Sequence, residues 1–164
     1  MAKFDIKLDK VGTTVKVTMV GTIDEDVDFN KYPIDGAEQV VLELENIKSI
    51  NSCGIREWIK WINTVPNAKV EYHLCPKIIV DQINMVQGFL PNHGTVKSFY
   101  VPFYSDESGE EKNILFNYGK EFDQTGMKLV PSIKGDDGKD MEMDVVETKY
   151  FKFLKKKKKK KKEV

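Results

Sequence analysis

The stretch VVLELENIKSINSCGI, residues Val40–Ile55, contains the change of pattern that decides the fold. It opens with the dense apolar run of a central strand, residues 40–44, and passes through small and polar residues before a helical pattern begins. Beyond this junction apolar residues recur at helical spacing, at Ile55, Trp58, Ile59, Ile62 and Val65. Pro66 ends the helix, because proline lacks a backbone N–H. The stretch therefore predicts a buried strand followed by an amphipathic helix that covers one face of a sheet.

Regular patterns on both sides of this stretch complete the predicted domain. Residues 4–8 and 15–19 alternate apolar and polar side chains and are separated by a turn with Gly12, which is typical of a β-hairpin. Residues 69–74 predict a further strand, and Pro76 stands at the first position of a second helix. Strand, helix, strand and helix joined by short links imply a parallel, right-handed crossover. We predict an α/β fold, a mixed sheet covered by helices on one face.

Composition and charge limit the class of protein. Forty per cent of the 164 residues are apolar, and Cys53 and Cys75 are too few for a disulfide framework. The first residues lack the apolar core of a signal peptide, and no window approaches the roughly 18 apolar residues of a membrane span. A cytoplasmic, reduced protein without a membrane span is expected. Without the lysine run at 155–162 and Glu163, 18 basic and 25 acidic residues leave a net charge of −7.

The character of the sequence changes after about Gly94. Residues 96–104 and 113–118 predict two strands joined by a polar hairpin loop, and an aromatic segment at 150–153 follows later. We expect the apolar residues of this extension to pack on the first domain. The predicted organisation has three parts: a domain at residues 1–95, a β-rich extension at 96–154 and a disordered lysine tail at 155–164.

The first part resembles the STAS domain, the module of bacterial anti-sigma factor antagonists. The resemblance is carried by the element Gly21-Thr22-Ile23-Asp24, the strand at 40–44, the junction Ser49–Ile55 and the helix after it, in this order and spacing. That family has a Gly-x-x-Asp element after its second strand and a phosphorylatable Asp-Ser-Ser-Gly-Leu loop before the helix. The resemblance implies a non-enzymatic protein–protein interaction module of bacterial signalling. Its partner would be an anti-sigma factor, a kinase-like protein or a scaffold of similar proteins.

Two interpretations of Ser52 stay open. The resemblance places it where a partner kinase phosphorylates a serine in many family members, and a phosphate at the start of a helix is stabilised by unpaired N–H groups and the macrodipole. Asn and Ser are also strong N-cap residues, so the same residues could simply begin a helix within a partner-binding loop. The loop differs from the family pattern at Asn51, Cys53 and Ile55, and the first of these removes a charge beside the hydroxyl.

The predicted partner-binding surface combines this loop with the exposed side of the helix. Its candidate residues are Asn51, Ser52, Cys53, Gly54, Arg56, Glu57 and Trp61. Trp61 lies at the margin of the apolar arc of the helix, where it would extend the contact surface or pack beneath the C-terminal extension.

The extension contains a second resemblance. Ser105-Asp106-Glu107-Ser108-Gly109 has the Cys-x-x-Cys-Gly frame of a zinc knuckle with serines in the cysteine positions, and so resembles a zinc ribbon that lost its cysteines. A second pair would be sought near Val130–Gly135 but has no clear counterpart there. Because serine hydroxyls are poor zinc ligands, we predict no metal site. A plain polar hairpin explains the same residues.

Other chemistries find little support. Cys53 at a helix start could be a reactive thiol, yet no His is near it in the sequence and no Cys-x-x-Cys is present. His73 and His93 have no metal-ligand spacing with the cysteines, and Asp136–Asp140 lacks the alternation of a calcium loop. No P-loop, dinucleotide fingerprint or nucleophile elbow is found. We therefore expect neither an enzyme nor a cofactor.

The lysine run supports a different hypothesis. Eight consecutive lysines could bind anionic surfaces, either membrane or nucleic acid, with the folded part merely presenting them. No aromatic residues are interleaved to contact bases, so no specific nucleic acid is expected. The sequence leaves the oligomeric state open.

Overall fold

The structure is a computed structural model that describes residues 3–154. The predicted lysine tail lies outside the described residues. Contacts divide the chain into two compact units, Met1–Phe99 and Tyr100–Val164, so the division falls four residues after the predicted end of the first domain at 95. Each unit is described by itself.

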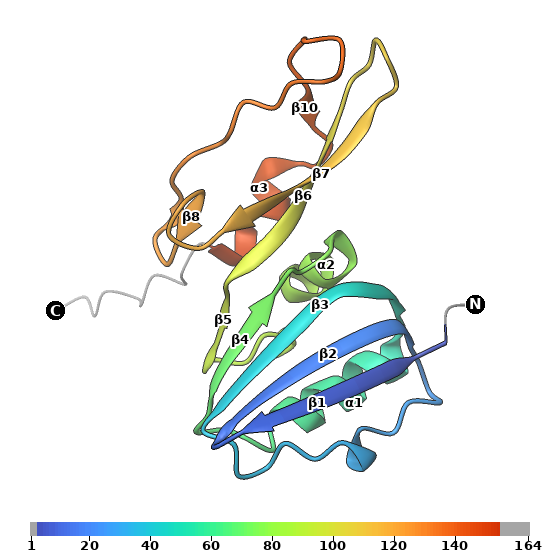
Figure 1. Ribbon diagram of the computed structural model, residues 1–164, viewed down its shortest axis with the longest axis vertical. Coiled ribbons are helices and arrows are strands. Elements are labelled where there is room, and N and C mark those ends of the chain that lie inside the picture. Colours follow the sequence, from blue (N-terminus) through green and yellow to red (C-terminus); the bar gives the residue numbers. More distant parts are fainter. Residues whose placement is uncertain (1–2, 155–164) are drawn as a thin grey trace, which may run out of the picture. The chain divides into compact units, whose positions relative to one another are not determined.

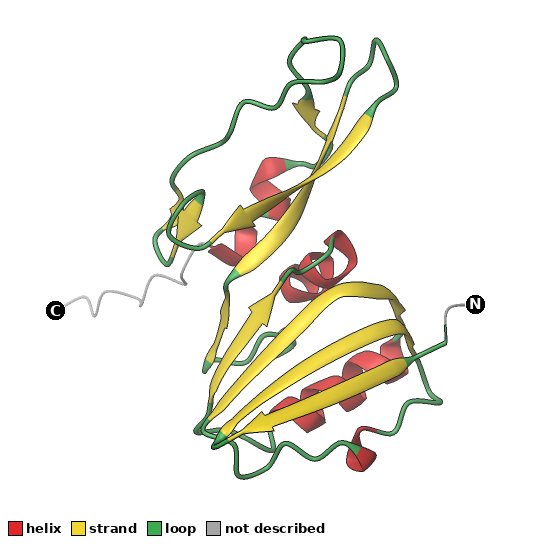
Figure 2. Cartoon of the chain, viewed as in Figure 1, coloured by secondary structure: helices red, strands yellow, loops and turns green. Residues whose placement is uncertain are grey.

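The first unit is built on a five-stranded mixed sheet with the strand order β1-β2-β3-β4-β5 (Figures 1 and 2). The strands are β1 Asp5–Val11, β2 Thr14–Ile23, β3 Gln39–Ile50, β4 Lys69–His73 and β5 Gly94–Val96. β1 and β2 form the predicted antiparallel hairpin, and every other neighbouring pair is parallel. The predicted α/β class with a mixed sheet is confirmed.

The predicted helices fill the crossovers between the parallel strands. α1, Ser52–Ile62, connects β3 to β4 and lies along one face of the sheet, while α2, Lys77–Met85, connects β4 to β5 (Figure 1). A short 3-10 helix, η1 at Phe29–Lys31, lies in the segment between β2 and β3. The crossovers that contain α1 and α2 advance in the same direction along the sheet, from β3 to β4 and from β4 to β5.

Aromatic side chains form the core between α1 and the sheet. Trp58 of α1 is fully buried and stacks on Phe89 at 4.9 Å between ring centroids. Its indole Nε1 donates a hydrogen bond to the Tyr72 hydroxyl at 2.9 Å, and that hydroxyl donates to the Phe89 carbonyl at 2.6 Å. Burial raises the pKa of Tyr72. The buried polar atoms of this core are thus hydrogen-bonded, as stable packing requires.

The other face of the sheet carries paired charges, and we call it the charged face. Because Tyr72 points toward α1, its strand neighbours Glu71 and His73 point the opposite way. The Glu71 side chain lies 3.0 Å from His73 Nε2 and 3.6 Å from Lys69 Nζ. Burial alone would raise the pKa of Glu71, but the hydrogen bond from His73 and the charges of Lys97, His73 and Lys69 outweigh it and hold the pKa below its usual value.

The second unit contains a three-stranded sheet of order β10-β6-β7 and a short hairpin. Its elements are β6 Ser98–Tyr104, β7 Glu111–Asn117, β8 Phe122–Asp123, β9 Gly126–Met127, β10 Glu142–Met143, α3 Glu147–Tyr150 and the 3-10 helix η2 Lys152–Leu154. The strand predicted at 96–104 is in fact two strands that part at Lys97, because residues 94–96 pair with β4 and the rest pairs with β7 and β10.

The aromatic residues of the second unit form a core of their own. Phe151 stacks on Phe116 at 6.2 Å, and Phe116 lies 6.4 Å from Phe103. The Tyr150 hydroxyl donates to the carbonyl of Tyr100. The C-terminal helical turns therefore cover the hairpin of their own unit.

Candidate functional site

Asn51 begins α1. Its backbone is extended, with φ −101° and ψ 179°, and its side-chain Oδ1 accepts a hydrogen bond from the Gly54 N–H at 2.9 Å. Its carbonyl accepts the first helical bond from the Ile55 N–H, also at 2.9 Å. Asn51 is therefore the N-cap residue. Ser52 is the first helical residue, and its hydroxyl is not needed to begin the helix.

The amide of Asn51 also ties a second loop to the start of α1. Its Nδ2 donates to Glu25 Oε2 at 2.7 Å, across the segment that follows β2. Hydrogen bonds from the Glu25 backbone and from Asn51 hold the pKa of Glu25 below its usual value. An aspartate at position 51 would put two carboxylates at this distance. The asparagine thus replaces a repulsion by a hydrogen bond.

Two glycines let the chain approach closely at this point. A Cβ on Gly54 would lie 2.5 Å from the Ile23 carbonyl oxygen. The start of α1 can therefore pack against the end of β2 only because residue 54 has no side chain. Gly21 has φ +99°, and a Cβ there would lie 2.2 Å from the Lys3 carbonyl oxygen. The Asn51 N–H donates to the Ile23 carbonyl at 3.1 Å. The Gly-x-x-Asp element and the loop before α1 are therefore parts of one junction.

The structure places most of the predicted partner-binding residues on one side of this junction. Asn51, Ser52 and Arg56 are exposed, Cys53 and Glu57 are half-buried, and Gly54 is buried against β2. Arg56 Nη2 lies 3.5 Å from Cys53 Sγ. Ser52 and Arg56 are four residues apart in the helix, so their side chains are neighbours on its surface.

Trp61 does not belong to the exposed surface. Its side chain is 5% exposed and stacks on Phe29 of η1 at 4.9 Å between ring centroids. Its Nε1 donates to the Tyr32 carbonyl at 2.8 Å. The prediction that Trp61 extends the contact surface is therefore wrong. An indole at the margin of the apolar arc can be covered by a segment distant in the sequence, and here that segment contains η1.

Glu25 is the residue that sequence reasoning missed. The Gly21-Thr22-Ile23-Asp24 element carries part of the resemblance to the STAS domain, whereas Glu25, the acidic residue just beyond it, has no place in that pattern. The contact with Asn51 spans 26 positions and has no periodic signal. The pairing of an unusual Asn in the loop with an exposed Glu after the element was the available clue.

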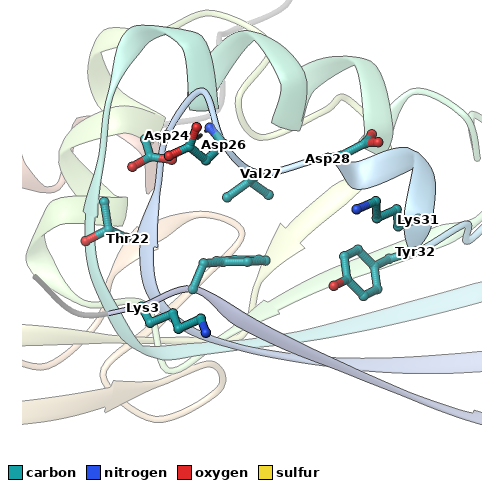
Figure 3. A pocket seen from close by; sticks show the side chains of 9 residues that line it. Lys3, Thr22, Asp24, Asp26, Val27, Asp28, Lys31 and Tyr32 are labelled. Carbon is teal, nitrogen blue, oxygen red and sulfur yellow. Dashed lines mark hydrogen bonds between the residues drawn. The ribbon is translucent and has the colours of Figure 1, made fainter.

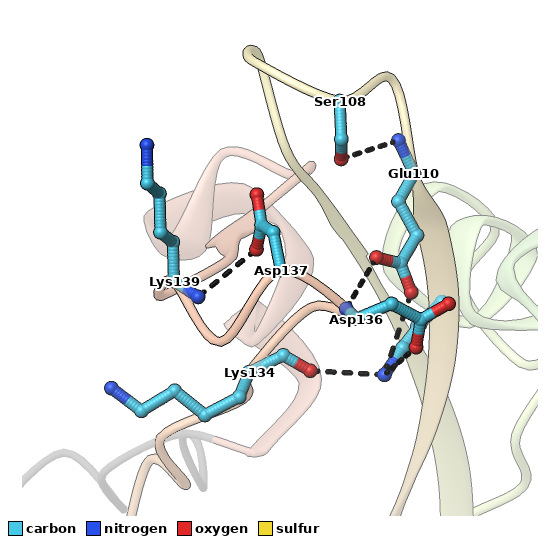
Figure 4. A network of polar contacts seen from close by, with 7 residues as sticks. Ser108, Glu110, Lys134, Asp136, Asp137 and Lys139 are labelled. Atoms are coloured by element: carbon cyan, nitrogen blue, oxygen red, sulfur yellow. Dashed lines mark hydrogen bonds and ion pairs between the residues drawn. The ribbon is translucent and has the colours of Figure 1, made fainter.

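Side-chain hydrogen bonds to the backbone order the turn at residues 105–110 of the second unit. Ser105 Oγ accepts a hydrogen bond from the Ser108 N–H at 3.3 Å, and Ser108 Oγ accepts one from the Glu110 N–H at 3.2 Å. A second turn repeats the pattern, because Asp137 Oδ1 accepts from the Lys139 N–H at 3.0 Å (Figure 4). This second turn, residues 134–139, overlaps the end of the segment 130–135.

Polar contacts hold these two turns together. Glu110 Oε1 accepts a hydrogen bond from the Asp136 N–H at 2.8 Å (Figure 4). Lys112 Nζ donates to the Lys134 carbonyl at 2.9 Å and lies 3.5 Å from Glu110 Oε2. Lys139 pairs with Glu107 across the same gap. Lys112 bridges the two turns through its hydrogen bond and its ion pair.

No protein-family model matches the chain, and no curated protein matches it. Within residues 3–154 no three His, Cys, Asp or Glu side chains are grouped so that they could hold a metal ion. No helix in the described part of the chain is long and apolar enough to cross a membrane.

Proposed function

We propose that the first unit is a non-enzymatic protein–protein interaction module, similar to the bacterial anti-sigma factor antagonists, that binds its partner through the loop Asn51–Gly54 and the exposed side of α1. The observation that carries the proposal is the exposed Ser52 in the first turn of a helix that Asn51 already caps. The hydroxyl of Ser52 has no part in capping and lies on an exposed part of this junction. This is where the STAS resemblance places the regulated serine.

The exposed side of α1 has the composition of a contact surface. Arg56 and Lys60 are exposed and follow Ser52 at helical spacing. Ile55 and Ile59 beside them are half-buried, so each presents part of an apolar side chain to solvent. Protein interfaces combine apolar contacts with a polar rim and are enriched in arginine. The partner class is an anti-sigma factor, a kinase-like protein or a scaffold of similar modules.

Phosphorylation of Ser52 is the proposed switch. A phosphate there would add about −1.5 to −2 charges at the first turn of α1, where backbone N–H groups and the macrodipole favour an anion. The Arg56 guanidinium is one turn away on the same side of the helix. The same charge would repel an acidic surface docked on the loop, and an apolar surface docked there would have to desolvate it. Phosphorylation therefore separates a partner-bound state from a released one.

Site-specific photo-crosslinking in the native host tests this function. A photoreactive phenylalanine analogue is placed at Arg56 and, as a matched control, at Lys7, an exposed residue of β1. The proposal expects a discrete protein adduct from position 56 that is absent from position 7 and is lost with Ser52→Asp or Ile55→Asp. Mass spectrometry of the purified protein is expected to find phosphate on Ser52.

Two outcomes would contradict the proposal. Equal adducts from both positions would show that the α1 surface is not selective. Loss of all adducts on deletion of the residues after Leu154, with the folded surface intact, would show that the lysine run carries the association. The second outcome would favour the hypothesis of an anionic-surface binder.

A further inference from the structure

A hollow lies beside the start of α1, between the beginning of the chain, the end of β2 and η1 (Figure 3). Its volume is about 470 Å³, which is within the usual size range of ligand-binding pockets. It is lined by Lys3, Phe4, Thr22, Asp24, Asp26, Val27, Asp28, Lys31 and Tyr32. None of these residues was assigned a role by the sequence, apart from the membership of Thr22 and Asp24 in the Gly-x-x-Asp element.

The hollow has an apolar middle and charged ends. Val27 is buried and lies between the aspartates of the loop, and Phe4 packs edge-on against Phe29 with 6.3 Å between centroids. In Figure 3 the side chains of Asp24 and Asp26 lie together at one end, while those of Asp28, Lys31 and Tyr32 lie at the other. A side chain that enters the hollow would therefore meet apolar surface in the middle and the Asp24 and Asp26 carboxylates at one end.

The charged residues of the hollow have no ion-pair partner among the described residues. These are its three aspartates and two lysines: Asp24, Asp26, Asp28, Lys3 and Lys31. Two of the carboxylates accept hydrogen bonds from the local backbone, Asp24 Oδ1 from the Asp26 N–H at 2.9 Å and Asp28 Oδ1 from the Asn30 N–H at 3.0 Å. Elsewhere in the same unit neighbouring charges form ion pairs. Unpaired carboxylates around a partly apolar hollow favour an external cation.

The loop that lines the hollow is hydrogen-bonded to the proposed contact surface. Glu25 lies between Asp24 and Asp26 in the sequence, and its carboxylate accepts the 2.7 Å hydrogen bond from Asn51. The loop that forms the wall of the hollow is thus held to the N-cap of α1. A partner docked on α1 would reach the hollow without leaving the surface already described.

We propose that the hollow receives one basic side chain, arginine or lysine, of the protein partner, and in this respect the inference rests on the proposed function. The cation lies between Asp24 and Asp26, and its aliphatic stem packs on Val27 and Phe4. Arg and Lys bury their methylene stems while their charged heads stay at polar groups, which matches this lining. Lys3 and Lys31 at the other edges disfavour an occupant with several neighbouring positive charges.

Blocked tripeptides test the charge preference directly. The full-length ¹⁵N-labelled protein is titrated with acetyl-Leu-Arg-Leu-amide, with the glutamine analogue and with the glutamate analogue, and backbone amide shifts are followed by NMR. The proposal expects saturable shifts at Thr22, Val27 and Tyr32 with the arginine peptide. It expects binding about threefold to fivefold weaker with the glutamine peptide, the range of an exposed ion pair, and weaker still with the glutamate peptide.

Two substitutions identify the site. Asp26→Asn should reduce the affinity for the arginine peptide to that of the glutamine peptide, whereas Asp9→Asn, an exposed change on the charged face, should leave both unchanged. Equal affinity for the arginine and glutamine peptides, or shifts confined to residues outside the hollow, would overturn the inference. So would tighter binding of the arginine peptide that Asp26→Asn does not alter.

The peptide titration and the crosslinking experiment can fail independently, so they test the hollow and the proposed function separately. Ile55→Asp changes the α1 surface and should leave peptide binding in the hollow unchanged. Failure of the crosslinks at position 56 with intact peptide binding would refute the proposed function while keeping the hollow as a site for a basic side chain. Failure of peptide binding with intact crosslinks would refute only the inference made here.

Discussion

The charged face of the sheet and the hollow beside α1 hold similar side chains but use them differently. On the charged face, Glu71 contacts His73 at 3.0 Å and Lys69 at 3.6 Å, and Lys16 pairs with Glu43 at 2.8 Å. In the hollow, no carboxylate forms an ion pair within the described residues, and those of Asp24 and Asp28 accept hydrogen bonds from the local backbone. The charges of the first region pair with one another, whereas the carboxylates of the second are free to contact a bound ligand.

This difference follows from how the two regions are built. A sheet holds side chains two apart on one strand, and diagonal neighbours on adjacent strands, on the same face at fixed short separations, so opposite charges there meet. The hollow is formed by a loop, a chain end and a 3-10 helix, whose side chains point toward a common space and not toward fixed partners. Ion pairs on a sheet are thus mainly structural, and unpaired charges around a concave surface indicate recognition. Removal of one negative charge should therefore lower the stability of the protein on the charged face, whereas in the hollow it should weaken ligand binding and leave the stability nearly unchanged.

Gly54→Ala is expected to have the largest effect, and it should disturb the hollow while sparing the charged face. The new Cβ would lie 2.5 Å from the Ile23 carbonyl oxygen, so α1 must move away from β2. Overpacking of this kind costs about 2–3 kcal/mol of unfolding free energy, which urea denaturation measures. NMR shifts should be large at Thr22 and Val27 and small at Glu71. Ser52→Ala, in the same turn, serves as the control and should change stability by less than about 0.5 kcal/mol.

Glu71→Gln is expected to destabilise the protein by about 1 kcal/mol at pH 7, because it removes a buried carboxylate from its cationic partners. The pKa of Glu71 is lowered in the folded state, so its contribution is present above the ordinary value of 4.5 and is lost as the pH falls through the lower folded value. The stability difference between wild type and variant should therefore shrink below about pH 4 in urea titrations. A difference that is constant between pH 7 and pH 3 would contradict the pairing.

Asn51→Ala and Asn51→Asp separate the two roles of Asn51. The alanine variant loses the cap and should lose about 1 kcal/mol of stability. The aspartate variant keeps a capping oxygen but places a carboxylate against Glu25, which now accepts a hydrogen bond at 2.7 Å. It should gain stability relative to wild type as the pH falls below about 5, since protonation of one carboxylate removes the repulsion. Thermal unfolding at several pH values measures both effects, and identical pH profiles would exclude the Glu25 contact.

Asp26→Asn is expected to have the smallest effect on folding and sharpens the comparison most directly. Asp26 is exposed and has no ion pair with any described residue, so its loss should change stability by less than about 0.5 kcal/mol. The same change should abolish the preference of the hollow for an arginine peptide. A loss of stability as large as that of Glu71→Gln would show that the carboxylates of the hollow are structural after all.

Most of the fold of the first unit could be predicted from the sequence. Period-two alternation located the β1–β2 hairpin, and helical spacing after residue 54 located α1, because these patterns are the local consequence of burying one face. The second unit was harder. A continuous β-rich segment at 96–104 has no local signal at Lys97, where pairing changes from β4 to the sheet of the second unit.

The candidate site was predicted in part. Residues 51–54 were located correctly at the start of a helix, and both Asn and Ser were recognised as capping residues, but only the structure shows that Asn51 is the cap. The exposure of Arg56 could be predicted from its position in the helical pattern. The burial of Trp61 did not, because it depends on Phe29 and Tyr32, some thirty positions away.

The sequence by itself determined the order of the first four strands and the two helices of the first unit, the helix start at residues 51–54 and the acidic character of the loop after β2. Each is a local property, written in periodicity, in capping residues and in composition. Only the tertiary structure decided which charges are paired, that Glu25 meets Asn51, and that a hollow forms over Val27. These features arise where segments far apart in the chain come together. They are stabilised by contacts between segments, so no single segment contains a pattern that predicts them.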